Sequence, residues 1–382
     1  MILFLHHRYR SPGGEERAVD DLLWLVREHL GERAELLQRD SARVSSVQAT
    51  AGLLGGGLRP EQVAEAVRST GARIVHAHNL HPTYGWRALA AARGAGAAVV
   101  WHLHQYRLVC AQGVCFRDGS DCISCHGANT LPGVIHNCRG SRAEALVYAA
   151  ALPLWQRHLA EHVDAFVAPS EAAMRRLRGL GAPLGDEAFV VPHVSREVVD
   201  APVRTDSAGR PARDGHALFS ARLVPEKGLA VAIEACRLAG LPLIVAGEGP
   251  ERARLAGAAA RVQFVGRVDP ERLRELRARA AVALVPSLFA ETFGLAAAEA
   301  MAAGVPVAAS RIGALPELVP QQWLGEPGDA ASLAAAIRRI LADPGAPQRA
   351  LERARKLTAP EVVAPALAAV YDRAVAGVRA RR

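Results

Sequence analysis

Two carboxylates, Glu291 and Glu299, stand on either side of a predicted helix start and have the side-chain type that hydroxyl recognition requires. A carboxylate can accept two hydrogen bonds, which suits the paired hydroxyls of a sugar or a ribose. Between the two lie the backbone N–H groups from Thr292 to Leu295, and N–H groups that open a helix form a ready site for phosphate. A solvated loop glutamate beside a surface helix glutamate would give the same spacing, so both interpretations stay open at this point.

The elements around these glutamates form the repeating unit of a doubly wound sheet. The apolar run at 282–285 predicts a buried strand, 288–294 a loop, and the alanine-rich stretch after it a helix that Gly304 ends. Residues 305–309 predict the next strand. Sheets of this kind bind ligands in the crevice outside the carboxyl ends of their strands, so the loop is expected to lie where a ligand binds.

Length and composition predict a two-domain globular protein. The chain has 382 residues, 50% hydrophobic and 22% charged, and no apolar run of the length that spans a bilayer. The N-terminus predicts a first strand rather than a signal peptide, and we expect the protein in the cytoplasm. A net charge of +8 leaves room for peripheral contact with an anionic membrane surface. No basic run is interleaved with aromatic residues, so we expect no nucleic-acid partner.

The first domain is predicted at 1–195, with strands that alternate with helices. His76 and His78 end one predicted strand, while His102 and His104 end the next and share a face of it. Each is either a ligand contact or a buried, hydrogen-bonded histidine, and His104, nearest the strand end, is the stronger candidate. Earlier in the chain Gly13 and Gly14 form either a backbone approach to a ligand or an ordinary tight turn.

A Pro-, Asp- and Gly-rich stretch at 196–215 predicts an exposed linker. After it, strands again alternate with helices. A second doubly wound domain is predicted at 216–358. Residues 359–382 predict a helix that crosses back to the first domain. The arginine-rich helices at 175–178 and 272–279 are interpreted as solvated faces.

Five of the six cysteines fall inside an insertion at 106–140, which carries little apolar content. Three interpretations stay open for them: a structural zinc, free or redox-active thiols, and a disulfide. The zinc ligands would be Cys110, Cys122, Cys125 and Cys138.

Lysine is used only at Lys227 and Lys356, against 46 lysines and arginines in total. A compact ammonium is therefore expected to be required at Lys227. The sequence holds no Walker loop and no Asp-x-Asp pair that would carry a divalent metal. This predicts a reaction that needs no metal or other cofactor.

Four segments of the second domain resemble the family 4 (group 1) retaining glycosyltransferases of the GT-B fold. They lie at 220–228, 245–250, 262–268 and 286–307, in the family's order and at its spacing. The resemblance continues more weakly over the first domain. It implies an α/β fold of two doubly wound, Rossmann-like parallel-sheet domains that face a central cleft.

The resemblance also implies a role for individual residues. Arg222 and Lys227 match the basic pair that holds the donor diphosphate, Glu291 the carboxylate on the donor sugar, and Glu299 the carboxylate on the ribose. His104 is similar to a first-domain histidine near the reacting sugar. Further donor contacts are implied at Gly13, Gly14, Gly247, Gly266, Thr292, Phe293, Gly294 and Leu295.

The implied activity is transfer of a hexose, with retention, from a nucleoside-diphosphate sugar to an acceptor hydroxyl. A UDP- or GDP-sugar is the expected donor, and a glycan, a lipid-linked glycan or a small molecule the acceptor. The expected context is bacterial polysaccharide, glycolipid or cell-envelope synthesis. Two alternatives stay open: a catalytically silent nucleotide-sugar-binding subunit, and a nucleotide-sugar epimerase of the same fold.

Overall fold

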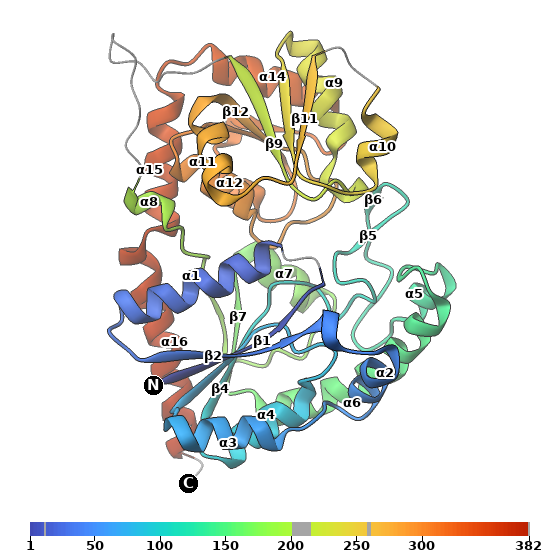
Figure 1. Cartoon of the computed structure of the whole chain (residues 1–382), viewed down its shortest axis with the longest axis vertical. Helices are drawn as coiled ribbons and strands as arrows, with labels where there is room; N and C mark the ends of the chain where they lie inside the picture. Colours follow the sequence, from blue (N-terminus) through green and yellow to red (C-terminus); the bar gives the residue numbers. More distant parts are fainter. Residues whose placement is uncertain (11–12, 201–214, 258–260, 381–382) are drawn as a thin grey trace. The chain divides into compact units, whose positions relative to one another are not determined.

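The computed structural model describes residues 1–10, 13–200, 215–257 and 261–380, which divide into two compact units (Figure 1). The first unit comprises Met1–Cys115, Ile123–Val194 and Pro360–Arg382, and the second Phe116–Cys122 and Ser195–Ala359. Each unit is built on a six-stranded sheet whose neighbouring strands all pair in parallel. The predicted class, two doubly wound parallel sheets, is confirmed.

The first sheet places its second strand at one edge and then continues in chain order. Across the sheet the strands are β2 (Ala34–Asp40), β1 (Ile2–Arg8), β3 (Ile74–Ala77), β4 (Ala98–His102), β7 (Ala165–Ala168) and β8 (Ala188–Val190). The helices of this unit are α1 (Gly14–Glu28), α2 (Ser46–Leu54), α3 (Glu61–Thr70), α4 (Gly85–Gly94), α5 (Leu131–Ile135), α6 (Arg142–His162), α7 (Glu171–Gly179) and α16 (Pro360–Ala380), with a short 3-10 turn η1 (Ser41–Arg43).

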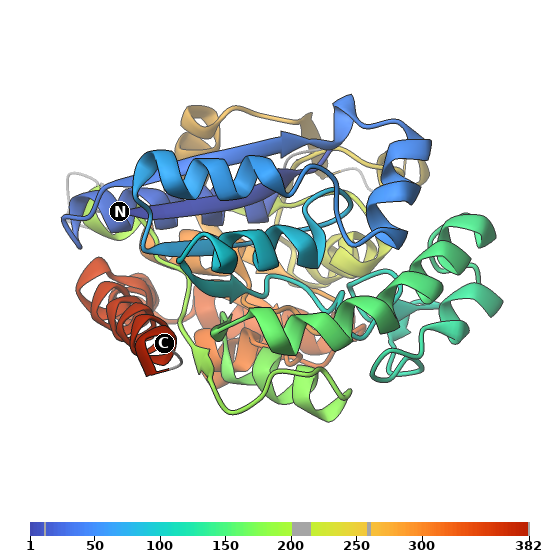
Figure 2. The ribbon, with the colours of Figure 1, turned by 90° about the horizontal axis from the view of Figure 1, so that it is seen from below.

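Helices cover both faces of the first sheet. On one face the apolar side of α1 packs with α16 against Phe4, Ile74 and Val100 of the strands. On the other, α3, α4 and α6 gather, as Figures 1 and 2 show from two directions. The helix predicted from residue 359 is therefore α16, and it belongs to the core of the first unit.

The second sheet has the strand order of a dinucleotide-binding fold, with its first strand near the middle. Across it the strands are β11 (Val262–Gly266), β10 (Leu243–Ala246), β9 (His216–Ser220), β12 (Ala280–Val285), β13 (Val307–Ser310) and β14 (Leu324–Gly325). Its helices are α8 (Glu197–Asp200), α9 (Leu229–Ala239), α10 (Glu251–Leu255), α11 (Pro270–Arg279), α12 (Leu295–Ala302), α13 (Leu315–Leu318), α14 (Ala330–Leu341) and α15 (Ala346–Thr358), with 3-10 turns η2 (Pro225–Lys227) and η3 (Gln321–Trp323).

Both sheets contain a point where the strand order reverses, and ligands of such folds bind there. In the first sheet this point lies between β1 and β3, and in the second between β9 and β12. Among the predicted site residues, Gly13 follows β1, Lys227 follows β9 and Glu291 follows β12.

Two predicted segments differ from the observed elements. The predicted linker 196–215 begins with α8, where Val198 is buried, and its residues 201–214 lie outside the described residues. The predicted insertion contains a hairpin of β5 (Phe116–Arg117) and β6 (Ser120–Asp121), which groups with the second unit. One reason is that the Ala290 N–H donates a hydrogen bond to Asp121 Oδ1 at 3.3 Å.

Among the helices that the structure describes, none combines the length and the apolar character needed to cross a membrane.

Candidate active site

An ion pair joins the two loops that flank the reversal point of the second sheet. Lys227 follows β9 and Glu291 follows β12, and the Lys227 Nζ lies 2.7 Å from Glu291 Oε1. The Ser287 hydroxyl donates a second hydrogen bond to the same oxygen at 2.6 Å. The Glu291 residue is only 9% exposed, so the carboxylate is held in one place. The structure therefore brings two of the predicted catalytic residues into direct contact.

Glycines allow these loops to pack backbone against backbone. A Cβ on Gly228 would lie 2.0 Å from the Pro286 carbonyl oxygen, and Gly228 has a positive φ of 70°. A Cβ on Gly313 would lie 2.5 Å from the Glu291 nitrogen. Because any larger residue at these positions would push the loops apart, the glycines fix where Lys227 and Glu291 meet.

The predicted donor residues Gly247 and Gly266 shape the turns after β10 and β11. Gly247 has φ 143°, and a Cβ there would lie 1.9 Å from the Ala221 carbonyl oxygen. Gly266 has φ 73°, and its carbonyl oxygen accepts a hydrogen bond from the Gly247 N–H at 2.7 Å. These contacts hold the loops after β9, β10 and β11 together at one end of the sheet.

Arg222 is exposed and directed along its own loop. Its side chain is 57% exposed, and its Nη2 lies 3.9 Å from Glu226 Oε1. The structure thus places the two members of the predicted basic pair differently, with Lys227 held by Glu291 and Arg222 open to solvent.

Glu299 lies in α12 and is held by a buried arginine of α11. Arg277 Nη2 donates to Glu299 Oε2, while its Nη1 lies 2.8 Å from Glu197 Oε1. The Arg277 side chain is only 2% exposed, whereas Arg272, Arg274 and Arg279 are exposed. The interpretation of this helix as a uniformly solvated face is therefore wrong at Arg277.

Sequence reasoning missed Arg277 because its partners are distant in the chain and its neighbours are exposed arginines. A signal was present, since Leu273 and Leu276 lie near it on the apolar side of α11. Arg277 orients Glu299 and compensates its charge.

The backbone N–H groups from Thr292 to Leu295 lie at the start of α12, as predicted. Gly294 is the residue before the helix and has a positive φ of 95°, which favours glycine. Thr292 is half-buried and Phe293 is buried, and Leu295 is the first helical residue. The first N–H groups of a helix have no partner within it, so the start of α12 has the polarity that favours an anion.

In the first unit, four predicted histidines stack as a column. His102 and His104 share a face as expected, with ring centroids 4.5 Å apart, and His76 and His78 lie 4.4 Å apart. The His78 Nδ1 and the His104 Nε2 are 2.8 Å apart. Burial lowers the pKa of His104 well below its ordinary value, with further lowering from neighbouring histidines, so its imidazole is neutral at pH 7.

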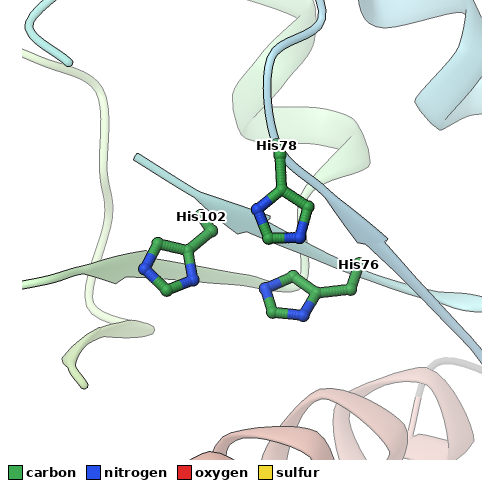
Figure 3. Close-up of side chains that lie close together, drawn as sticks. All are labelled: His76, His78 and His102. Carbon is green, nitrogen blue, oxygen red and sulfur yellow. The ribbon is translucent and has the colours of Figure 1, made fainter. Parts of the chain in front are cut away.

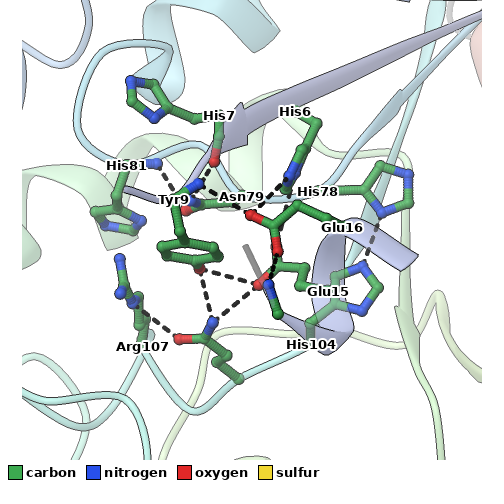
Figure 4. Close-up of polar contacts among 12 residues, drawn as sticks. His6, His7, Tyr9, Glu15, Glu16, His78, Asn79, His81, His104 and Arg107 are labelled. Atoms are coloured by element: carbon green, nitrogen blue, oxygen red, sulfur yellow. Dashed lines mark hydrogen bonds and ion pairs between the residues drawn. The ribbon is translucent and has the colours of Figure 1, made fainter. Parts of the chain in front are cut away.

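A partly buried polar network lies beside this column, at the reversal point of the first sheet (Figure 4). The Tyr9 hydroxyl donates to Glu15 Oε2 at 2.9 Å, and the Gln105 amide donates to the same oxygen at 2.8 Å. The Arg107 Nε donates to Gln105 Oε1 at 3.0 Å. Burial raises the pKa of Glu15 above its ordinary value, against the lowering effect of His6. Sequence reasoning assigned no role to Glu15, Gln105 or Arg107, although they lie in the segments that carry the weaker resemblance.

Gly13 is the residue before α1 and lies beside this network. Its N–H donates to Glu16 Oε2 at 2.7 Å, and the Tyr9 N–H donates to Glu16 Oε1 at 2.9 Å. A Cβ on Gly13 would meet no atom closer than 4.0 Å, and Gly14 is the first residue of the helix. The fold itself therefore does not require glycine at position 13.

None of the six cysteines, all in described residues, forms a disulfide. The Cys115 thiol and then backbone N–H groups hydrogen-bond to Cys110 and lower its pKa to about 6. Within the described residues, the close groups of three metal-ligating side chains contain histidine and glutamate but no cysteine. Zinc binding by Cys110, Cys122, Cys125 and Cys138 stays a prediction.

Two family models match most of the chain. The model described as "Glycosyl transferase 4-like domain" matches residues 14–193, and "Glycosyl transferases group 1" matches 205–357. A curated relative, glycogen synthase of Mycobacterium tuberculosis, is 41% identical over 206 residues, which cover 49% of this chain and 49% of the relative. The match thus spans about half the length of that relative.

Solved structures match the fold over nearly the whole chain. Sucrose-phosphate synthase from Thermosynechococcus elongatus is similar with a TM-score of 0.68 and 22% identity, covering 98% of this chain and 99% of that one. HepE of Anabaena, solved in complex with UDP-glucose, is similar with a TM-score of 0.63 and 18% identity, covering 97% and 99%. Taken with the family models, these matches show that the chain belongs to the group 1 glycosyltransferases and has the GT-B fold.

Proposed function

We propose that the chain transfers a hexose from a nucleoside-diphosphate sugar to an acceptor hydroxyl, with retention of anomeric configuration. The similar HepE structure holds UDP-glucose, which supports a uridine nucleotide as the donor to test first. The observation that carries the proposal is the Lys227–Glu291 ion pair at the reversal point of the second sheet.

The ion pair supplies a cation that could bind the diphosphate and a carboxylate that could bind a sugar hydroxyl. A donor diphosphate would share the Lys227 ammonium, and a donor sugar hydroxyl would donate to Glu291. Because Ser287 also donates to Glu291, the carboxylate would stay oriented when the ammonium turns toward the phosphates. The exposed Arg222 supplies a second cation for the diphosphate.

Departure of the nucleoside diphosphate places negative charge on its phosphate oxygens. Fixed cations and helix N–H groups directed at that charge lower the barrier, and removal of one such donor typically costs about 2.7–4 kcal/mol. Lys227, Arg222 and the start of α12 are the groups proposed to act in this way. Glu299, oriented by Arg277, is proposed to hold the ribose hydroxyls.

Retention is proposed to follow from a displacement on one face of the sugar. The leaving phosphate oxygen would accept the proton of the acceptor hydroxyl while the new glycosidic bond forms through an oxocarbenium-like state. No divalent metal is assigned to this step, in keeping with the lack of an Asp-x-Asp pair. His104 is proposed to contact the reacting sugar, and the Glu15–Gln105–Arg107 network to contribute to the acceptor side.

The deciding experiment is a panel of nucleoside-diphosphate sugars, scored for binding and for slow hydrolysis. We expect one preferred donor, with hydrolysis reduced at least a hundredfold in Glu291→Ala and in Lys227→Ala. Binding without hydrolysis in the wild type, unchanged in both variants, would instead favour a silent nucleotide-sugar-binding subunit.

Product stereochemistry and metal dependence test the finer parts of the proposal. Once an acceptor is found, NMR of the product should show the donor's anomeric configuration, and an inverted product would refute the mechanism. Turnover should not depend on added Mg²⁺ or Mn²⁺. A rate that rises in proportion to either metal would overturn the metal-independent step.

A further inference from the structure

Three buried imidazoles converge at the carboxyl ends of β3 and β4 (Figure 3). His76 lies in β3, His78 directly follows it, and His102 ends β4. Their exposed fractions are 0%, 1% and 1%. One ring nitrogen of each lies within 4.8 Å of the others. Alternation along parallel neighbouring strands puts all three on one face of the sheet, so the fold itself brings the rings together.

The ring nitrogens divide into those that are hydrogen-bonded and those that are not. His76 Nδ1 lies 2.8 Å from the Tyr371 hydroxyl of α16, and His78 Nδ1 lies 2.8 Å from His104 Nε2. The Nε2 atoms of His76 and His78, and both ring nitrogens of His102, are buried without a hydrogen-bond partner among the described groups. Buried polar atoms are nearly always satisfied, so several unsatisfied nitrogens in one place require an explanation.

The three rings have the charge state that metal ligation requires. Burial lowers the pKa of His76 to about 3, and burial together with neighbouring histidines lowers the pKa of His78 and of His102 well below the ordinary value. Burial thus disfavours the charged form of each ring, and a neutral imidazole carries a lone pair. A neutral cluster without arginine or lysine does not attract an anion, whereas neutral imidazole nitrogen suits zinc and the related divalent ions.

The hydrogen bonds around the cluster also match those of metal-bound histidines. A ligating histidine usually donates its other ring N–H to a neighbour, which fixes the ring and its tautomer. Here Tyr371 and His104 occupy that position for His76 and His78 and leave the Nε2 of each without a hydrogen-bond partner among the described groups. His102 then provides the third nitrogen from the neighbouring strand.

We propose that His76, His78 and His102 bind one zinc-class divalent ion, with a water or another small ligand in the fourth position. The ion would join the ends of β3 and β4 and, through Tyr371, the C-terminal helix. It would also fix the ring of His104 through His78. The proposal does not rest on the proposed transfer reaction, which uses no metal at the donor diphosphate.

Two other groups could hold an ion and must be separated from this one. His102, His104 and His193 also bring three nitrogens within 4.8 Å, but His104 Nε2 is already engaged by His78. His158, Glu161 and His162 form a partly exposed group on α6. We therefore place all tests in a His158→Asn/His162→Asn background.

The test compares phenylalanine variants of the full-length protein, because phenylalanine keeps an aromatic ring and removes the nitrogens. Protein stripped with EDTA is dialysed against zinc, and bound metal and melting temperature are measured. The background protein should bind one more zinc than His102→Phe, and zinc should raise its melting temperature by several degrees. The zinc-dependent rise should be absent in His102→Phe and in His76→Phe, while His193→Phe should retain it.

Two further readouts separate a metal site from a merely structural one. The metal-free melting temperature of His102→Phe should equal or exceed that of the background, because unsatisfied nitrogens have been removed. Tyr371→Phe should weaken zinc affinity about tenfold or more. A Co²⁺-loaded sample should lack the thiolate charge-transfer bands that a cysteine site would give.

Three results would overturn the proposal. The first is equal zinc content and equal zinc-dependent stabilisation in the background protein and in His102→Phe. The second is loss of zinc in His193→Phe with retention in His76→Phe, which would move the ion to the other histidine group. The third is no zinc uptake by the background protein at micromolar zinc beyond what the cysteine segment binds.

Discussion

The two sheets of this protein share one architecture but use opposite electrostatics at their reversal points. The first unit contains all but one, His216, of the 14 histidines, and burial lowers the pKa of His78, His102 and His104 at its strand ends. The second unit contains both lysines. Its loops are joined by the Lys227–Glu291 ion pair, and its helices α11 and α12 by the Arg277–Glu299 ion pair.

This difference has a physical reason in the proposed reaction. A leaving diphosphate carries charge at every pH at which the enzyme works, so permanent cations on the second sheet suit it. Buried imidazoles, and a Glu15 whose pKa burial raises, suit an uncharged sugar or acceptor better than a charged one. The contrast leads to four predictions, from the largest expected effect to the smallest.

The largest effect is expected from the buried cation of the second unit. Arg277→Ala leaves Glu299 and Glu197 without their shared partner, and breaking a buried ion pair costs about 3–5 kcal/mol. Urea unfolding should show this loss of stability. The matched control is Arg274→Ala, exposed on the same helix, which should change stability by no more than about 0.5 kcal/mol. Equal effects of the two variants would contradict the buried network.

Removal of the ammonium at the reversal point should act on turnover rather than on folding. We expect Lys227→Ala to lower kcat by a factor of about 10²–10³, because the charge on the leaving diphosphate loses its nearest cation. Lys356→Ala removes the other lysine, exposed on α15, and serves as the control, with unchanged kcat. The assignment fails if Lys227→Ala raises KM alone, because the ammonium would then act only in ground-state binding.

The neutral histidines of the first unit should make the protein sensitive to acid. Burial, in part offset by a backbone hydrogen bond from Arg8, lowers the pKa of His7 from 6.5 to about 4. Below pH 6.5 the unfolded chain therefore binds a proton that the folded chain refuses, and stability falls as pH decreases toward 4. For this one group the loss is about 1 kcal/mol at pH 5.5.

Urea unfolding at pH 7.5, 6.5 and 5.5, with EDTA present, measures this dependence in the wild type and in His7→Gln. The variant loses the contact with Ser41, 3.1 Å from His7 Nδ1, and should be less stable at pH 7.5. Its stability should nevertheless fall less steeply on acidification. Parallel curves for the two proteins would show that His7 is not the group responsible.

Sequence patterns predicted the strands that have an apolar core on both faces. The strand predicted at 282–285 is β12, which begins two residues earlier, and the strand predicted at 305–309 is β13, which runs from Val307 to Ser310. The missed β2 (Ala34–Asp40) is an edge strand of mixed, half-exposed residues, so it has no apolar run to detect. The local apolar pattern does not identify a strand whose residues are partly exposed to solvent.

Site residues were predictable where a local motif contains them and not where their role depends on partners in distant segments. Glu291 and Lys227 were identified through local motifs, and the structure joins them. Arg277 depends on partners in α8 and α12, and the Glu15 network depends on Gln105, far along the chain. Similarly, the shared face of His102 and His104 followed from strand alternation, but convergence with His76 and His78 required the pairing of β3 with β4.

The smallest effect on stability, and the sharpest comparison of the two reversal points, concerns glycine. Gly228 in the second unit cannot accept a Cβ, which would lie 2.0 Å from the Pro286 carbonyl oxygen, whereas a Cβ on Gly13 meets only Glu16 at 4.0 Å. Gly13→Ala also keeps a φ of −142°, which alanine adopts freely, so its stability should change by no more than about 1 kcal/mol. If the space beside Gly13 receives the donor, Gly13→Ala should nevertheless lower kcat/KM at least tenfold. Unchanged turnover would show that Gly13 serves only to cap α1. Ligand recognition in the first unit would then depend on its buried side chains.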